Sequence, residues 1–247
     1  MYRPYIFSFL WISFHGNKKR DKTNHRLKKG AKYCINKVDF VSKGYFMAHE
    51  KMKLIDISVD LINAKPSYQD TAAVTKVESE SESGGSRTIL LSSLHNGTHI
   101  CAPSQYIKGA KSLDAYEVER FFGECRVVKA KGALTAAWIE KMGLYRSDKL
   151  LIKGEGKGKI DVSAAEELMA SGIRLIGTDA AQLAIDSQIE QVRRILADGD
   201  CLVLEGLNLE KAEQGTYFLF AQPVLMEGSE AAPCRAVLAE DYIYWNR

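Results

Sequence analysis

Short apolar runs alternate with segments of helical spacing through the second half of this 247-residue chain. The runs at residues 149–153, 173–177 and 201–205 have the length and composition of buried strands. Residues 163–171 and 189–197 repeat apolar side chains with the period of a helix, and glycines follow both. Strands and helices that alternate in this way build one sheet with helices packed on it. The sequence therefore predicts an α/β fold with a mixed sheet and flanking helices.

The part of the chain before residue 123 carries a different pattern. Residues 53–59 alternate apolar and polar side chains, which is typical of a strand. Residues 74–77 and 88–94 predict two further strands. The polar linker between them, residues 78–86, is rich in Ser, Glu and Gly and favours a hairpin loop or a flexible flap. Residues 113–122 have helical apolar spacing, so we expect a helix there.

Charge divides the chain near residue 47. Residues 1–47 hold eleven Lys/Arg and two Asp/Glu, a net charge of +9, whereas the other 200 residues hold twenty-three and twenty-nine, a net charge of −6. We therefore predict a poorly ordered basic extension over residues 1–46 and one folded domain over residues 47–247. The acidic domain gives no electrostatic reason to expect nucleic-acid binding.

Apolar runs and cysteines indicate in which cellular compartment the protein resides. No run reaches the roughly 18–20 apolar residues that a membrane span requires. The apolar stretch at residues 5–14 is followed, not preceded, by basic residues, which argues against a signal peptide. The five cysteines are dispersed and contain no CxxC pair, a pattern typical of a reducing compartment. We therefore expect a cytoplasmic protein that does not bind a membrane.

The segment at residues 94–106, LHNGTHICAPSQY, carries the candidate chemistry. In an extended strand, every second side chain lies on the same face, so His95, Gly97, His99 and Cys101 would share one face. Imidazole and thiolate are good zinc ligands, and a distant carboxylate could complete a tetrahedral site. A chance His-x-x-x-His pair beside a buried cysteine is the alternative. The segment holds the only histidines of residues 52–247, which favours a metal site.

This segment resembles the motif His-x-Gly-Thr-His-x-Asp-x-Pro-x-His of the cyclase family, which includes bacterial kynurenine formamidases. Residues 175–179, 203–207 and 228–236 are similar to the family's Gly-Ile-Asp, Leu-Glu-Asn-Leu and Gly-x-x-x-x-Pro-x-Arg-Ala segments, in the same order. The resemblance extends over roughly residues 52–241. It implies the cyclase-like swivelling β/β/α domain.

The resemblance also implies roles for individual residues. The family binds two metal ions through the motif histidines and aspartate, a later histidine and the glutamate of the Leu-Glu-Asn-Leu segment. His95, His99 and Glu205 stand at three of these positions. Pro66 and Tyr68 lie in the stretch that resembles the family's substrate loop, so we expect them to bind substrate.

Three positions depart from the family pattern. Cys101 replaces the bridging aspartate, Gln105 replaces the acid/base histidine, and Arg193 stands where the later metal-binding histidine is expected. A thiolate is softer than a carboxylate and favours zinc, and a guanidinium repels a second cation. We therefore expect one metal ion rather than two, with zinc as the first candidate and manganese as the second. The expected metal ligands are His95, His99, Cys101 and Glu205.

The function that the resemblance implies is metal-dependent hydrolysis of a C–N bond in a small amide or formamide, as in an arylformamidase. Gln105 would hydrogen-bond the substrate or an oxyanion, and Glu205 would act as the base. The expected partners are a small-molecule substrate and, as in the family, a second copy in a homodimer. Two alternatives remain: a degenerate, non-catalytic relative that binds a metal or small ligand, and a structural protein without a metal.

Overall fold

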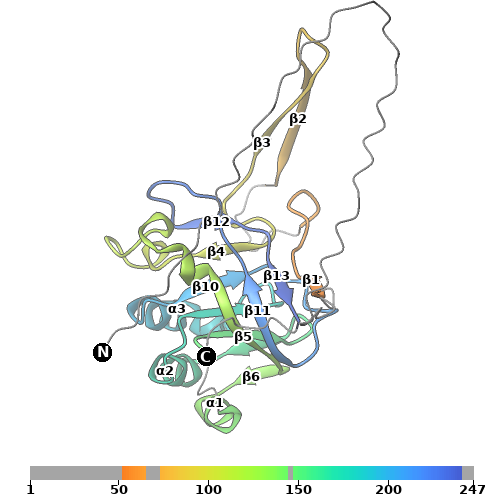
Figure 1. Cartoon of the computed structure of the whole chain (residues 1–247). Helices are drawn as coiled ribbons and strands as arrows, with labels where there is room; N and C mark the ends of the chain where they lie inside the picture. The colour runs from red at the N-terminus through yellow and green to blue at the C-terminus, as the bar shows by residue number, and fades with distance from the viewer. Residues whose placement is uncertain (1–51, 65–72, 144–146, 241–247) are drawn as a thin grey trace, which may run out of the picture. The chain divides into compact units, whose positions relative to one another are not determined.

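A computed structural model describes residues 52–64, 73–143 and 147–240. The predicted extension over residues 1–46 lies outside these ranges. Most of the described strands form one nine-stranded sheet, which is drawn at the centre of Figure 1. In sheet order these strands are β1 (Leu54–Asp56), β13 (Val237–Ala239), β11 (Gly215–Phe220), β5 (Phe122–Lys129), β7 (Lys149–Lys153), β9 (Leu175–Thr178), β10 (Leu202–Glu205), β4 (His99–Cys101) and β12 (Ala231–Pro233).

The sheet is mixed, as the alternation of strands and helices predicts. Strands β5, β7, β9 and β10 run parallel at its centre. Antiparallel strands flank them on both sides, with β11, β13 and β1 beside β5, and β4 and β12 beside β10. The prediction of an α/β fold with a mixed sheet and flanking helices is therefore confirmed.

Two apolar cores form because successive side chains of a buried strand point to opposite faces. On β7, Leu150 and Ile152 pack into one core, and Leu151 packs into the other. Helices α1 (Ala136–Met142), α2 (Val162–Ala170) and α3 (Ile189–Asp198) cover the first face. Both faces of the central strands are thus buried, which is why their sequences are continuous apolar runs.

The predicted helix over residues 113–122 is wrong. The segment forms two short 3-10 helices, Leu113–Ala115 and Val118–Phe121, and then enters β5. Tyr116 between them is extended, and its hydroxyl donates to the Asp200 carboxylate at 2.6 Å. Arg120 donates to the Asp200 carbonyl. These tertiary contacts, with aromatic residues of low helix propensity, outweigh the apolar spacing.

A separate hairpin precedes the motif segment. Strands β2 (Thr75–Glu80) and β3 (Ser86–Leu91) pair only with each other among the described strands, which confirms the predicted hairpin (Figure 1). Every residue of both strands is exposed. The register places Val77, Ile89 and Leu91 on one face and Lys76 and Glu78, which form an ion pair, on the other. The hairpin is therefore amphipathic, and its apolar face faces solvent in one copy of the chain.

The smaller elements complete the described chain. A second two-stranded sheet joins two short strands in parallel, and two further 3-10 helices lie in connections. No helix within the described ranges combines the length and apolar character needed to cross a membrane. The two short parallel strands are β6 (Gly132–Leu134) and β8 (Gly158–Ile160), and the two 3-10 helices are η1 (Pro103–Gln105) and η4 (Asp186–Gln188).

A close backbone approach joins the end of β10 to the turn before β4. Gly206 has φ +66°, and a Cβ atom there would lie 2.1 Å from the carbonyl oxygen of Gly97. The Thr98 hydroxyl donates to the Gly206 carbonyl, and Val59 N–H donates to the Thr98 hydroxyl at 2.8 Å. The absence of a side chain at Gly206 therefore sets how closely the motif turn can approach the sheet.

Gly206→Ala is expected to destabilise the protein by about 2–4 kcal/mol, because the left-handed backbone costs about 1–2 kcal/mol and the clash adds to it. Urea denaturation measures the change. Gly172→Ala is the control, since Gly172 has φ +80° with open space around its Cβ position, and it should cost only the backbone part, about 1–2 kcal/mol. Equal losses in the two variants would contradict the close-approach argument.

Candidate metal centre

The motif segment is a turn followed by a strand. Leu94 and His95 lie in a turn, residues 96–98 bend, and only His99–Cys101 form β4. The prediction that the whole segment from His95 to Cys101 is extended is therefore wrong. Gly97 causes the bend, because its φ of +64° is left-handed and a Cβ atom there would lie 3.1 Å from Leu61 Cα.

Three donor atoms nonetheless converge. One ligand atom each of His95, His99 and Cys101 lies within 4.8 Å of the others. His95 Nδ1 is 3.5 Å from Cys101 Sγ, and the two imidazole rings meet edge-on with centroids 5.2 Å apart. In a zinc site, bonds of about 2.0–2.3 Å place ligand atoms roughly 3.3–3.7 Å apart. The donors thus stand close to the spacing that one ion would require.

His99 supplies the observation that points most directly to a ligand. Its side chain is fully buried, and Nδ1 lies 3.0 Å from the Gly97 carbonyl oxygen, so Nδ1 carries the hydrogen and donates. The lone pair is then on Nε2, which is buried and has no hydrogen-bond partner within the part of the chain that the structure describes. A buried lone pair left in this state is costly unless something binds it.

The protonation states suit a soft cation. Burial lowers the pKa of both His95 and His99, which favours the neutral imidazoles that bind metal. Burial also raises the pKa of the Cys101 thiol well above its ordinary value, so the thiol keeps its proton until a cation replaces it. Two imidazoles and a thiolate form a donor set that fits Zn²⁺.

Glu205 stands beside these donors but is held by another group. It pairs with His99 across β10 and β4, and its Oε2 atom is 3.7 Å from His99 Nε2. Its Oε1 atom accepts from Arg193 on α3 and from the backbone N–H of Leu183. Both Glu205 and Arg193 are buried, and the Arg193 guanidinium also lies 5.5 Å from the centre of the Tyr106 ring. The carboxylate thus balances a fixed cation.

The other residues expected at the site have different outcomes. Gln105 ends the 3-10 helix that follows β4, and its amide oxygen is buried without a hydrogen-bond partner among the described residues. Pro66 and Tyr68, the expected substrate-binding residues, lie outside the described residues.

Sequence reasoning did not find Glu230. Its Oε1 atom lies 3.5 Å from His95 Nε2, on the opposite side of the ring from Cys101. Glu230 immediately precedes β12, which pairs with β4 and so brings this residue to the motif segment. The pairing joins strands about 130 residues apart, and no local pattern in the sequence signals it.

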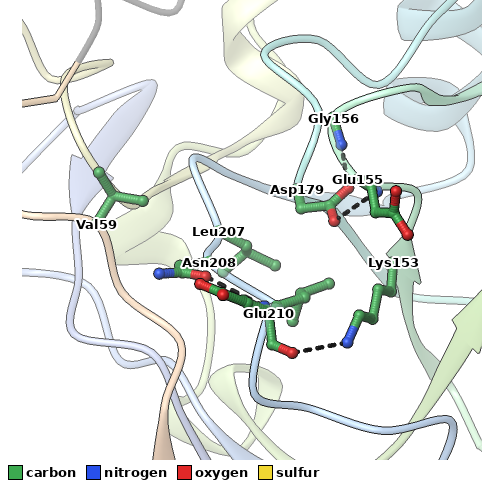
Figure 2. A pocket seen from close by; sticks show the side chains of 9 residues that line it. Val59, Lys153, Glu155, Gly156, Asp179, Leu207, Asn208 and Glu210 are labelled. Atoms are coloured by element: carbon green, nitrogen blue, oxygen red, sulfur yellow. Dashed lines mark hydrogen bonds between the residues drawn. The ribbon is translucent and has the colours of Figure 1, made fainter.

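A cleft of about 530 Å³ lies elsewhere, at the carboxyl ends of β7 and β9 (Figure 2). Its glycine-rich loop at residues 154–158 offers no free anion cradle, because Asp179 accepts the backbone N–H groups of Gly154, Glu155 and Gly156. Lys153 donates to the Glu210 carbonyl oxygen. The polar groups of this cleft therefore stabilise the loops around it. Its lining residues are Val59, Lys153, Glu155, Gly156, Asp179, Leu207, Asn208, Leu209 and Glu210.

Comparison with known proteins identifies relatives of this chain. The family model described as "Putative cyclase" matches residues 55–185, more than half of the chain. A kynurenine formamidase of Maricaulis maris is 32% identical over 162 residues, which cover 60% of this chain and 78% of the relative. A kynurenine formamidase of Salinibacter ruber is 29% identical over 208 residues, covering 76% of this chain and 98% of the relative.

Solved structures share the fold. One described as a "predicted metal-dependent hydrolase from Bacillus stearothermophilus" superposes with a TM-score of 0.68 at 22% identity, covering 76% of this chain and 98% of that one. Isatin hydrolase A from Labrenzia aggregata superposes with a TM-score of 0.65 at 18% identity, covering 78% of this chain and 95% of that one. The arrangement of the sheet is therefore that of these proteins.

The converged donors predict that purified protein holds about one equivalent of zinc per chain. Cys101→Ala should weaken zinc binding by more than about 100-fold, because it removes the softest donor. Competition with a chromophoric chelator measures the affinity. Cys125→Ala, which removes a fully buried thiol from β5, is the control and should leave zinc binding unchanged. Equal zinc binding in the two variants would exclude Cys101 as a ligand.

Proposed function

The chain belongs to the cyclase family, and we propose that it is a metal-dependent hydrolase that cleaves the C–N bond of a small amide or formamide. The convergence of His95, His99 and Cys101 around the buried Nε2 atom of His99 carries this proposal. The relatives named kynurenine formamidase favour hydrolysis, and nothing in the comparisons supports the alternative of a non-catalytic ligand-binding relative.

The donor set supports one zinc ion held by His95, His99 and Cys101. Zinc, when bound, polarises a carbonyl group and lowers the pKa of its water to about 7. Manganese prefers oxygen ligands and fits the sulfur of Cys101 less well. Arg193 disfavours a second ion, because its guanidinium carries a fixed positive charge against Glu205.

Glu205 is the proposed base. Its Oε1 atom accepts from Arg193 and from the backbone N–H of Leu183, and its Oε2 atom lies 3.7 Å from His99 Nε2. In hydrolysis, the oxygen of water bonds to the substrate carbonyl carbon, and the C–N bond then breaks. Oε2 would accept the proton that the water loses and return it to the departing nitrogen, so that an acid and an amine result.

Gln105 is the proposed substrate-binding amide. It lies four residues after Cys101, and its buried amide oxygen is without a hydrogen-bond partner among the residues described. A carboxamide can accept the N–H of a substrate amide and can donate to an oxygen that gains negative charge. It cannot transfer a proton as a histidine does. We therefore assign Gln105 to orientation and charge stabilisation, and the proton transfer to Glu205.

The identity of the substrate is also part of the proposal. An aromatic formamide such as N-formylkynurenine is the trial substrate that the relatives' names suggest. Pro66 and Tyr68 are proposed to contact its ring, since proline and tyrosine side chains both offer apolar surface.

The zinc-loaded protein is expected to release formate from N-formylkynurenine, measured by absorbance of the product amine. His99→Ala should lower kcat/KM by more than about 100-fold, and Gln105→Ala by roughly 100–1,000-fold through loss of transition-state hydrogen bonding. Cys125→Ala is again the control and should keep its activity. Hydrolysis that persists in His99→Ala protein would refute the assignment of the site.

We also propose that the protein is a homodimer in which the β2–β3 hairpin packs on a second copy. A two-stranded ribbon is marginally stable in water unless its apolar face is covered. Within one copy, Ile89 and Leu91 on the hairpin and Val224 and Leu225 on the loop after β11 are all more than half exposed. A two-fold axis would let the hairpin of each copy cover the loop of the other. The apolar residues of the hairpin and of the loop would then be buried in both copies.

Ile89→Thr and Leu91→Thr are expected to weaken the dimer by at least about tenfold each, because they remove buried apolar surface but keep strand propensity. Analytical ultracentrifugation over a range of concentrations measures the dissociation constant. Leu90→Thr is the matched control, since Leu90 lies on the opposite face of the hairpin and should have little effect. A wild-type protein that remains monomeric at high micromolar concentration would disprove the proposal.

A further inference from the structure

We propose that Glu230 is a positioning residue of the metal centre, which fixes the tautomer of His95 so that Nδ1 presents its lone pair toward Cys101. The inference rests on the metal site of the proposed function, but it concerns a residue that the motif does not contain.

The argument begins with the two sides of the His95 ring. Nδ1 lies 3.5 Å from Cys101 Sγ, and Nε2 lies 3.5 Å from Glu230 Oε1. A neutral imidazole carries one hydrogen, and a carboxylate can only accept. A carboxylate beside Nε2 therefore favours the tautomer with hydrogen on Nε2, and this tautomer leaves the Nδ1 lone pair on the side of the thiol.

His99 shows the same arrangement with a different acceptor. Its Nδ1–H donates to the Gly97 carbonyl oxygen at 3.0 Å, and its Nε2 lone pair is buried near Glu205. In both rings, one nitrogen therefore lies near an oxygen acceptor, and the other nitrogen lies among the converged donor atoms. Metal-binding histidines generally have their second nitrogen held by a carboxylate or a backbone carbonyl, and the acceptor sets the ring orientation.

The backbone holds Glu230 in place. Its carbonyl oxygen accepts the N–H of Ala102 at 2.7 Å, directly after Cys101 on the chain. The next residue, Ala231, pairs with Cys101 in the β12–β4 ladder. The Glu230 backbone is thus held beside β4, the strand that carries His99 and Cys101. From this position the Glu230 carboxylate reaches His95.

Charge and exposure distinguish Glu230 from Glu205. Glu205 is fully buried, and its charge is balanced by Arg193. The Glu230 side chain is 43% exposed, whereas that of His95 is 15% exposed. An exposed ion pair contributes only about 0–1 kcal/mol to stability, so Glu230 adds little to holding the fold together. The location of Glu230 at the outer edge of the site therefore suits a role in orienting His95.

The test compares Glu230→Ala and Glu230→Gln with Glu227→Ala and Glu227→Gln. Glu227 is an exposed glutamate of the same loop and matches the change in charge and size. Zinc affinity, measured by competition with a chromophoric chelator, should fall by 10–100-fold in the Glu230 variants. It should stay within about twofold of wild type in the Glu227 variants, and Glu230→Asp should recover part of the loss.

The tautomer itself is measured on the metal-free protein by long-range ¹H–¹⁵N correlation of the histidine rings. Wild type is expected to show hydrogen on Nε2 of His95, and Glu230→Ala should show a larger fraction with hydrogen on Nδ1. An unchanged tautomer in Glu230→Ala overturns the inference, even if the variant binds zinc more weakly.

The two proposals fail in different ways. If zinc-loaded wild type hydrolyses no formamide while the Glu230 variants lose zinc affinity and change tautomer, the proposed function fails and the role of Glu230 stands. If wild type is active and the Glu230 variants match the Glu227 variants in both measurements, the role of Glu230 fails and the proposed function stands.

Discussion

The buried ion pair between Arg193 of α3 and Glu205 of β10 fixes the charge at the centre of this protein. A buried carboxylate beside His99 requires a positive charge nearby, which either a metal ion or a protein side chain can supply. Here the guanidinium supplies it, and it also ties a helix to the sheet. Loss of either partner would leave an uncompensated charge in the core, at a cost of about 3–5 kcal/mol. In the proposed site, this ion pair is the reason to expect one metal ion rather than two.

The three departures from the family motif are consistent with one another when considered with this ion pair. In the proposed site, Arg193 would supply the charge of a second cation, and Cys101 would bind a single soft ion in place of a bridging ligand. Gln105 keeps hydrogen-bonding capacity near the site without proton transfer. Random loss of function would not be expected to keep His95, His99 and Cys101 together around a buried His99 nitrogen that has no hydrogen-bond partner among the described residues.

The sequence predicted the mixed α/β sheet, because buried parallel strands produce apolar runs whose length can be read directly. It also predicted that His95, His99 and Cys101 belong together, but for an incorrect reason, since Gly97 turns the chain where an extended strand was expected. It could not predict the position of Glu230, which depends on the pairing of β12 with β4. Contacts between distant strands are set by the packing of the whole sheet, and no short-range pattern records them.

The hairpin and the metal centre are joined by a very short connection. β3 ends at Leu91, and only Ser92, Ser93 and Leu94 separate it from His95. A displacement of the hairpin would therefore also shift the backbone of His95, because so few residues lie between them. If the proposed metal site holds an ion at His95, a partner bound to the hairpin and that ion would influence each other's binding, because such coupling is reciprocal.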